Sequence, residues 1–229
     1  MMDKRYELKF IFDNIQTLNF LNFLKKKSHI KKKYNNRAVN SIYFDNLQMK
    51  SAIENLSGIS DRRKFRARWY NFNLDEKKIQ NVIFEIKSRS GRISSKENFN
   101  FIDNISSNAL QYKTFYNTYK KLIIKKYFKN VDFDLFPKLL VRYNREYYQS
   151  FNNIRVTIDN KIEFYDASCL FSKVYSGNRY QYSKNIVEIK FPLNQKKNIV
   201  EFLRLSSLNP TRHSKYLIGL SYINRVLYI

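Results

Sequence analysis

Polar and apolar residues alternate one by one along several segments of this chain, and the polar positions are mostly Lys, Arg or Glu. Because successive side chains of a β-strand point to opposite faces, each segment predicts a strand with one apolar and one ionic face. If such strands close into a barrel with the ionic faces inward, they form a cationic tunnel that suits a polyanion or a triphosphate. The segments are 5–10, 64–69, 84–87, 141–145, 155–159 and 187–191.

Apolar residues at helical spacing predict helices between these strands. Asp13, with Gln16 three residues later, predicts a capping box at the start of a helix that ends near Lys27. Helices interspersed with strands of the alternating type predict an α+β fold in a single domain covering residues 1–229. The other expected helices are 48–57, 107–127 and 194–206, with a mixed segment at 214–228. The other expected strands are 39–46, 62–71 and 81–90, and a run from 137 to about 191.

The composition indicates a folded chain with an anionic partner. Hydrophobic residues make up 43% of the 229 positions, enough for a sizeable core, and the formal net charge is +24. A field of that sign favours nucleic acid, an acidic membrane surface, nucleotides or polyphosphate. The run Lys31, Lys32 and Lys33 is either a solvated loop or a patch that attracts phosphate.

Several classes of site are excluded or disfavoured by what the chain lacks. A single cysteine, Cys169, excludes an internal disulfide and a cysteine-rich zinc site and fits a reducing compartment. Only four glycines are present, so no glycine-rich phosphate loop exists, and His29 and His213 lie far apart in sequence. No apolar run is long enough for a transmembrane helix and no signal peptide is recognisable, so the cytoplasm is the expected location.

Cations recur on one face of the predicted strands. Lys64, Arg66 and Arg68 share a strand face, where a guanidinium can bind phosphate oxygens bidentately and an ammonium adds a compact charge. Cationic strands packed in one domain repel each other unless something anionic lies between them. Later strands repeat the pattern, with Tyr143 and Arg145 on one and Arg155, Thr157 and Asp159 on another.

Three glutamates each lie two residues before a lysine on a predicted strand. Such a carboxylate either pairs with its cationic neighbours or binds a hard divalent cation such as Mg²⁺ or Mn²⁺. The metal interpretation is strongest for Glu188, whose strand comes late in the chain, close to Lys215. The three pairs are Glu7 with Lys9, Glu85 with Lys87, and Glu188 with Lys190.

Taken in order, the motifs resemble the VTC domain, the polyphosphate polymerase module of the vacuolar transporter chaperone complex and its bacterial relatives. That domain belongs to the CYTH-like triphosphate tunnel metalloenzyme superfamily. The ordered set spans almost the whole chain. It comprises RYELKF (5–10), VNSIYFDN (39–46), KFRARWY (64–70), FEIK (84–87), RYNREYY (142–148), RVTID (155–159), VEIK (187–190) and HSKY (213–216).

The resemblance implies an antiparallel barrel of roughly eight strands that forms a tunnel with flanking helices. It also implies a phosphotransferase that moves the γ-phosphate of ATP onto a growing inorganic polyphosphate chain, with Mn²⁺ or Mg²⁺. Tyr143 and Ser214 would add hydroxyl contacts and Glu188 would hold the metal; Glu7, Lys64 and Lys190 are further candidates on the ionic faces. By motif, the phosphate ligands would be Lys9, Arg66, Arg68, Lys87, Arg145, Arg155 and Lys215.

One position departs from the hydrolytic branches of the superfamily. Those members carry two glutamates in the first strand, whereas this chain has Arg5 at the first of these positions and keeps only Glu7. Fewer carboxylates disfavour the adenylate cyclase and thiamine triphosphatase branches. The membrane helices and phosphate-sensing domain of the eukaryotic complex do not occur in the chain, and the sequence leaves open whether a membrane or an accessory protein is a partner.

Two alternatives to a polymerase stay open. One is a metal-dependent triphosphatase or polyphosphatase on the same fold, in which water attacks the phosphate. The other is a non-catalytic module that binds polyphosphate or nucleic acid. Nucleic acid is disfavoured, because Tyr and Phe mostly alternate opposite the charges and are therefore expected in the core.

Overall fold

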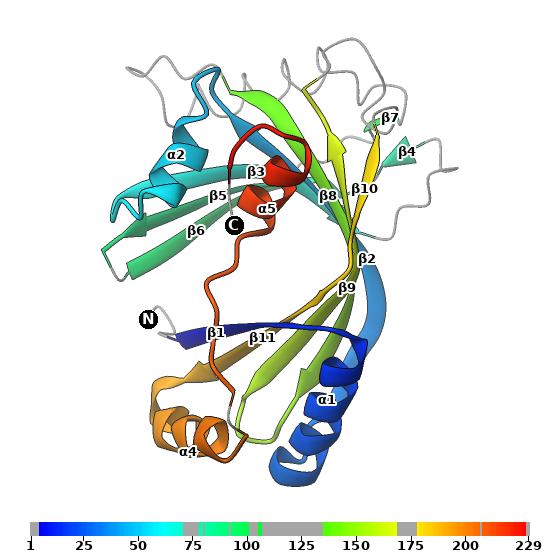
Figure 1. Ribbon diagram of the computed structural model, residues 1–229, viewed down its shortest axis with the longest axis vertical. Helices are drawn as coiled ribbons and strands as arrows, with labels where there is room; N and C mark the ends of the chain where they lie inside the picture. Colours follow the sequence, from blue (N-terminus) through cyan, green and yellow to red (C-terminus); the bar gives the residue numbers. More distant parts are fainter. Residues whose placement is uncertain are drawn as a thin grey trace. The chain divides into compact units, whose positions relative to one another are not determined.

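The computed structural model of the protein describes residues 5–70, 78–79, 81–91, 93–100, 105–106, 135–168, 178–206 and 208–227 (Figure 1). The main sheet is antiparallel and has the strand order β1-β11-β9-β8-β2-β3-β5-β6, with β10 paired to β9. Its strands are β1 (Arg5–Phe12), β2 (Lys31–Asp45), β3 (Arg62–Tyr70), β5 (Ile83–Ser90), β6 (Ile93–Asn100), β8 (Phe136–Gln149), β9 (Arg155–Asp166), β10 (Arg179–Tyr182) and β11 (Asn185–Pro192).

The remaining elements are short strands and helices. Strands β4 (Lys78–Ile79) and β7 (Ile105–Ser106) form a separate two-stranded sheet. The helices are α1 (Asn14–Ser28), α2 (Lys50–Leu56), α4 (Lys196–Ser206) and α5 (Lys215–Tyr222), with a 3-10 turn, η2 (Leu193–Gln195), before α4. The expected α+β fold, an antiparallel sheet of about eight strands with flanking helices, is confirmed.

The chain divides into two compact units. Unit 1 comprises residues 1–38, 143–162 and 181–214, and unit 2 comprises residues 39–142, 163–180 and 215–229. Strands β2, β8 and β9 contribute residues to both units. That residues 1–229 form a single domain stays a prediction.

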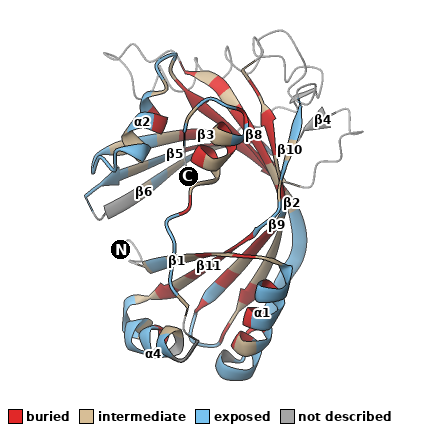
Figure 2. Cartoon of the chain, in the orientation of Figure 1, coloured by how far each residue is buried: buried red, intermediate tan, exposed pale blue. Residues whose placement is uncertain are grey.

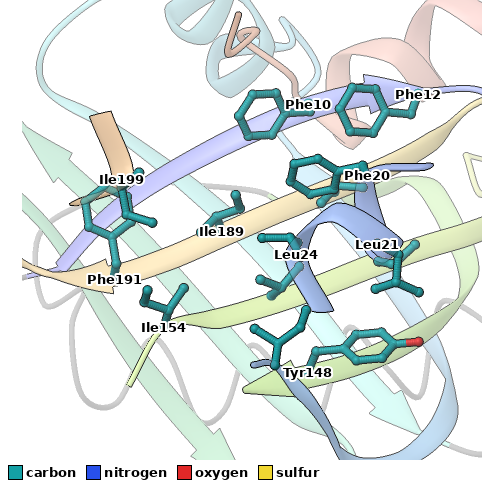
Figure 3. Packing of buried hydrophobic residues seen from close by; sticks show 14 residues of the cluster. Phe10, Phe12, Phe20, Leu21, Leu24, Tyr148, Ile154, Ile189, Phe191 and Ile199 are labelled. Carbon is teal, nitrogen blue, oxygen red and sulfur yellow. The ribbon is translucent and has the colours of Figure 1, made fainter. Parts of the chain in front are cut away.

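In unit 1, α1 packs on the apolar face of β1, β9 and β11 (Figure 3). The helix begins with the predicted capping box: Gln16 donates its backbone N–H to the Asp13 carboxylate, and Asp13 donates to the Gln16 amide oxygen. The rings of Phe10, Phe12 and Phe20 lie 5.3–5.8 Å apart in the core. This packing leaves the other faces of β1, β9 and β11 to polar side chains.

In unit 2, β3 and β5 bury their apolar faces in a second core that includes Phe44, Trp69 and Phe84. Buried Asp45 holds the end of β2 to the start of α2, because its carboxylate accepts the backbone N–H groups of Ser51 and Ala52. The two cores therefore fix which strand faces remain polar in each unit, and along β8 and β11 buried residues, in red, alternate with intermediate ones, in tan (Figure 2).

The sequence reading and the structure differ at a few elements. Strand β2 begins at Lys31, so the loop interpretation of Lys31, Lys32 and Lys33 is wrong. Nearly every residue at the start of this strand is polar, so the sequence there shows no alternation of polar and apolar residues. Strand β6 was not predicted, since Ile93 and Phe99 are the only apolar residues in it. The expected helix at 107–127 and Cys169 lie outside the described residues.

Candidate functional site

The ionic face of β3 in unit 2 carries the predicted cations Lys64, Arg66 and Arg68. The strand ladder places Arg66 between Tyr43 of β2 and Glu85 of β5. Arg68 is buried, and its Nε donates to the hydroxyl of Ser41 at 3.1 Å. The face is therefore held by neighbours on both sides, which pre-positions the guanidinium groups.

Glu85 is the centre of this face. Its carboxylate contacts Arg66 and Lys96 directly, and Arg68 Nη1 lies 3.9 Å from it. Burial alone would raise the pKa of Glu85, but the charges of Arg66 and Arg68 and the hydrogen bonds from Lys96 and Arg66 lower the pKa to about 2. The carboxylate is thus ionised at neutral pH and orders the cations around it.

Three lysines lie directly opposite each other across the neighbouring strands. Lys64 of β3 is paired with Lys87 of β5, and Lys87 is paired with Lys96 of β6. Like charges at directly opposite positions of an antiparallel sheet are destabilising. A row of this kind is typical of a surface that binds an anion, which relieves the repulsion.

Tyr43 and Lys215 extend the face of unit 2. The hydroxyl of Tyr43 accepts a hydrogen bond from Arg66 at 3.5 Å, and its ring stacks on Tyr216 at 5.1 Å. Burial raises the pKa of Tyr43, but the charges of Arg66, Arg68 and Lys215 lower it more, so the pKa falls below its usual value. The Tyr216 hydroxyl donates to Asp45 at 2.7 Å, which anchors the start of α5 and with it Lys215.

In unit 1, the polar faces of β1, β11 and β9 form a second ionic surface. One row of the ladder runs Lys9, Glu188, Thr157, and the next runs Glu7, Lys190, Arg155. Every member of the two rows except Thr157 was predicted as a site residue, so the antiparallel register brings together residues as far apart in sequence as Glu7 and Lys190.

Ion pairs connect the two rows. Lys190 Nζ lies 2.6 Å from Glu188 and 3.5 Å from Glu7, and Lys9 Nζ lies 2.9 Å from Glu7. Burial raises the pKa of Glu188 and Glu7 raises it further, but Lys190, Lys9 and Arg145 outweigh them and the pKa is lowered. Both carboxylates therefore sit in a cationic surrounding that keeps Glu188 ionised.

Arg145 of β8 is fixed by a bidentate ion pair. Its Nε and Nη2 donate to the two oxygens of buried Asp159 at 2.6 and 2.8 Å, and its guanidinium lies 5.2 Å from the ring of Tyr143. Burial lowers the pKa of Arg145, but Asp159 and Tyr143 raise it well above its usual value. Part of its phosphate-binding capacity is thus already engaged with Asp159.

The oxygen atoms around Glu188 include possible ligands for a divalent cation. The hydroxyl oxygen of Thr157, opposite Glu188 on the ladder, is buried, and no described residue hydrogen-bonds to it. Among the described residues no group of three or more His, Cys, Asp or Glu side chains could hold a metal by itself. Mg²⁺ and similar ions commonly use one or two carboxylates together with substrate phosphates. Glu7 and Glu188 fit that kind of site.

The predicted residues differ in their exposure to solvent. Arg155 and Lys87 are exposed, whereas Ser214 is half-buried just before α5. A cavity of about 380 Å³ in unit 2 is lined by Arg63, Phe65 and Ser88, which alternate with the predicted residues along β3 and β5. Arg62 and Arg89, which alternate in step with Lys64 and Lys87, also line the cavity, whereas Lys64, Arg66 and Lys87 do not.

Sequence reasoning missed two residues of the ionic face in unit 2. Lys96 lies on the unpredicted strand β6, and Tyr43 was assigned only to a strand. Glu85 was predicted either to pair with cationic neighbours or to bind a divalent cation, and its ion pairs with Arg66 and Lys96 agree with the first alternative. A usable signal existed for Tyr43, because it is a polar-tipped residue in a segment that carries a family motif. Lys96 had no such signal.

Comparisons with known proteins agree with this geometry. The sequence matches the VTC domain family over residues 4–224. No curated protein sequence is significantly similar to the chain. Among the described residues, no helix has the length and apolar character needed to cross a membrane.

Two solved structures share the fold. One is a Hippeastrum protein, assigned as an adenylyl cyclase, that shows a dominant triphosphatase activity; it is 14% identical, covers 98% of each chain and has a TM-score of 0.50. The other is the PH1819 protein of Pyrococcus horikoshii, 13% identical, covering 94% of this chain and 99% of its own, also with a TM-score of 0.50. The shared fold is the triphosphate tunnel fold expected from the sequence.

Proposed function

Because this chain belongs to the VTC domain family, an enzyme family with the triphosphate tunnel fold, we propose that it is a polyphosphate polymerase. It transfers the γ-phosphate of ATP onto the end of a growing inorganic polyphosphate chain. The observation that carries the proposal is the ionic face of unit 2, where, among the described residues, lysines and arginines of three adjacent strands outnumber the carboxylate of Glu85. Such a face favours the binding of an anion.

Phosphate binding is assigned to side chains, since the chain has no glycine-rich loop. Arg66 and Arg68 are proposed to bind phosphoryl oxygens, with Lys64, Lys87 and Lys215 adding charge. In unit 1 the proposed ligands are Lys9, Arg145, Arg155 and Lys190, with hydroxyl contacts from Tyr143 and Ser214.

The transfer itself requires no protein nucleophile. A terminal oxygen of the polyphosphate acceptor forms a new bond to the γ-phosphorus, the bond from that phosphorus to the bridging oxygen breaks, and ADP leaves with the electron pair. The proposed roles of the arginines and lysines are to align the two phosphates and to neutralise the charge that builds up. Glu85 keeps the guanidinium groups of β3 in place.

Glu188 and Glu7 are the proposed ligands of Mn²⁺ or Mg²⁺. When bound, such a cation neutralises charge on the transferred phosphates. The chain's own lysines, Lys9 and Lys190, orient the two carboxylates by ion pairs and help to keep Glu188 ionised. A bound cation would compete with Lys190 for Glu188, and the phosphates would compete with Glu188 for Lys190.

A triphosphatase is the second candidate function. It is favoured by the Hippeastrum neighbour, which has a dominant triphosphatase activity on the same fold. The two reactions use the same phosphate ligands and differ only in whether a phosphate end or water attacks the γ-phosphorus.

The deciding experiment is incubation of the purified protein with ATP and Mn²⁺, followed by a polyacrylamide gel stained for polyphosphate and a parallel assay of free phosphate. A ladder of long chains with little free phosphate is the expected result. Free phosphate without chains would show that the protein is a triphosphatase. If neither polyphosphate nor free phosphate forms, the protein is a non-catalytic binding module.

The variant Arg66→Ala tests the ionic face of unit 2. We expect it to lower turnover by about 10²-fold or more, because a preorganised cation at the transferred phosphate is lost. Arg63→Ala is the matched control, since Arg63 is an exposed arginine on the opposite face of the same strand. Equal turnover of the two variants would remove Arg66 from the site.

The variant Glu188→Ala tests the metal assignment. It should still bind tripolyphosphate, because the lysines and arginines remain, but lose turnover that depends on the metal. Calorimetric titration with Mn²⁺ provides a readout besides activity. Unchanged Mn²⁺ binding together with full turnover would show that Glu188 is not a metal ligand.

A further inference from the structure

Unit 1 carries a dense group of lysines that the proposed site does not use. Lys25, Lys26 and Lys27 end α1, and Lys31, Lys32 and Lys33 begin β2, with only residues 28–30 between them. All six lysines are exposed. The sequence has no Asp or Glu from residue 14 to residue 44, so no carboxylate of this segment offsets their charge.

The lysines are fixed to the core of unit 1. Ile30, between the two lysine runs, is buried in the same cluster as Tyr148 and Ile154, which flank the turn between β8 and β9. Along β2, residues 31–37 are all exposed and residues 39–45 are all buried. The lysine-rich end of the strand is therefore exposed to solvent and not part of the core (Figure 2).

Phe151 lies beside these lysines at the tip of the β8–β9 turn. Its side chain is 82% exposed, and Lys31 Nζ lies 5.7 Å from the centre of its ring. The turn is closed by hydrogen bonds from Ser150 N–H to the Ile154 carbonyl and from Asn153 N–H to the Ser150 carbonyl. A structured turn thus holds a large apolar ring in water, within a cationic surface.

We propose that Phe151 and the six lysines form a docking surface for an anionic lipid membrane. The lysines bind the phosphate headgroups, and the ring of Phe151 enters the interfacial layer of the bilayer. Charge complementarity selects an acidic surface, and the exposed ring needs a partner with an apolar phase. The proposal is independent of the polymerase activity.

Two other polyanions fit the surface less well. Inorganic polyphosphate has no apolar part, so it would give Phe151 no partner. Nucleic acid would need aromatic rings free for base stacking. The neighbouring rings of Tyr34 and Tyr147 instead contact each other edge-on at 5.9 Å, with Arg37 lying 5.9 Å from both.

Sedimentation with vesicles provides the first test. The protein should sediment with vesicles that contain phosphatidylglycerol, stay in solution with pure phosphatidylcholine, and be released by high salt. Phe151→Trp adds a direct reporter, because the only native tryptophan, Trp69, is fully buried. Its emission should shift to the blue on the anionic vesicles and be quenched by brominated lipid.

Two double charge reversals distinguish binding at this surface from a general attraction between a basic protein and anionic vesicles. Lys32→Glu with Lys33→Glu should weaken vesicle binding by roughly 20-fold or more, since each lysine at an acidic bilayer contributes about fivefold. Lys196→Glu with Lys197→Glu, on exposed positions of α4, makes the same charge change and should have a much smaller effect. Circular dichroism checks that both remain folded.

Three results would overturn the proposal. The first is an equal loss of binding in both charge-reversal pairs. The second is a Phe151→Trp emission that does not respond to anionic vesicles. The third is an emission that responds to a single-stranded oligonucleotide but escapes quenching by brominated lipid, which would assign the surface to nucleic acid.

Discussion

Glu85 determines the electrostatics of unit 2 because it is a buried carboxylate that contacts Arg66 and Lys96, with Arg68 close by. Its pKa of about 2 lies below the value near 4.3 that an unfolded chain would have. A depressed pKa means that the folded state releases the proton more readily than the unfolded state. The stabilisation is therefore complete above about pH 5 and is lost as the pH falls toward 2.

The variant Glu85→Gln should be less stable than the wild type by about 3 kcal/mol at pH 7, from the size of the pKa shift. The difference in the free energy of unfolding should shrink as the pH is lowered from 5 to 2. Urea denaturation at a series of pH values measures it.

Glu97→Gln is the control for this prediction. Glu97 lies on β6, opposite Ile86 rather than on the ionic row, and is only half-buried. The same change of charge there should cost much less stability at pH 7. A difference between wild type and Glu85→Gln that stays constant across the pH range would contradict the role given to Glu85.

Residue identities on the ionic faces could be predicted where they alternate with apolar residues on a central strand. Arg66, Arg68 and Glu188 follow that rule, because a one-residue slip would expose the core face, and Lys9 alternates in the same way on β1 at the end of the strand order. Their partners could not be predicted, since the register between strands distant in sequence is not encoded locally. Lys96 is such a case: only the pairing of β5 with β6 brings it to Glu85.

At the scale of elements, the helices and central strands follow from local signals and the polar edge strand does not. The capping box of Asp13 marks α1, and β3, β8 and β11 alternate clearly. Strand β6 has mostly polar residues, so it depends on pairing with β5 rather than on its own hydrophobic face. Propensity and pattern alone could not find it.

Helix α5 depends on a close approach at Gly219. A Cβ atom added there would lie 2.4 Å from Leu139 Cδ2 and 2.7 Å from Phe164 Cδ1, and both side chains are buried. Gly219→Ala should therefore push α5 away from β8 and β9 and lower the free energy of unfolding by about 1–3 kcal/mol, despite the better helix propensity of alanine. Thermal denaturation measures the change.

Ser221→Ala, two residues along the same helix, is the matched control. Its side chain is only half-buried, so the melting temperature should change little. Because α5 carries Lys215 and Tyr216, displacement of the helix should also weaken tripolyphosphate binding in Gly219→Ala. A variant as stable as the wild type would show that the contact with Leu139 and Phe164 relaxes at no cost.

At the scale of the whole molecule, a net charge of +24 opposes folding through self-repulsion. The strands concentrate this repulsion in places such as the lysine row of Lys64, Lys87 and Lys96. The sequence predicted the excess charge and the family, but the register that assembles the ionic face within each unit depends on long-range pairing, which no local pattern contains.

Tripolyphosphate should stabilise the protein far more than sodium chloride of the same ionic strength. Salt screens all charges evenly, whereas a triphosphate bound at the ionic faces stabilises the folded state by mass action. The melting temperature, followed over a titration with each salt, should rise steeply only with tripolyphosphate. An equal rise in melting temperature with both salts would mean that the positive charge of the protein is only screened and that no specific anion site exists.

Lys87→Met locates the effect in unit 2. Without ligand, the variant should melt about 2 °C higher than the wild type, because two like-charge pairs across the strands are lost. With tripolyphosphate, it should gain less than the wild type, because a phosphate ligand is missing. Lys197→Met, an equal loss of charge on exposed α4, should keep the full gain. A higher melting temperature without ligand, together with a smaller rise on adding tripolyphosphate, would show that Lys87 serves binding at the expense of stability. If the melting temperature of Lys87→Met rises with tripolyphosphate as much as that of the wild type, Lys87 is not part of the site.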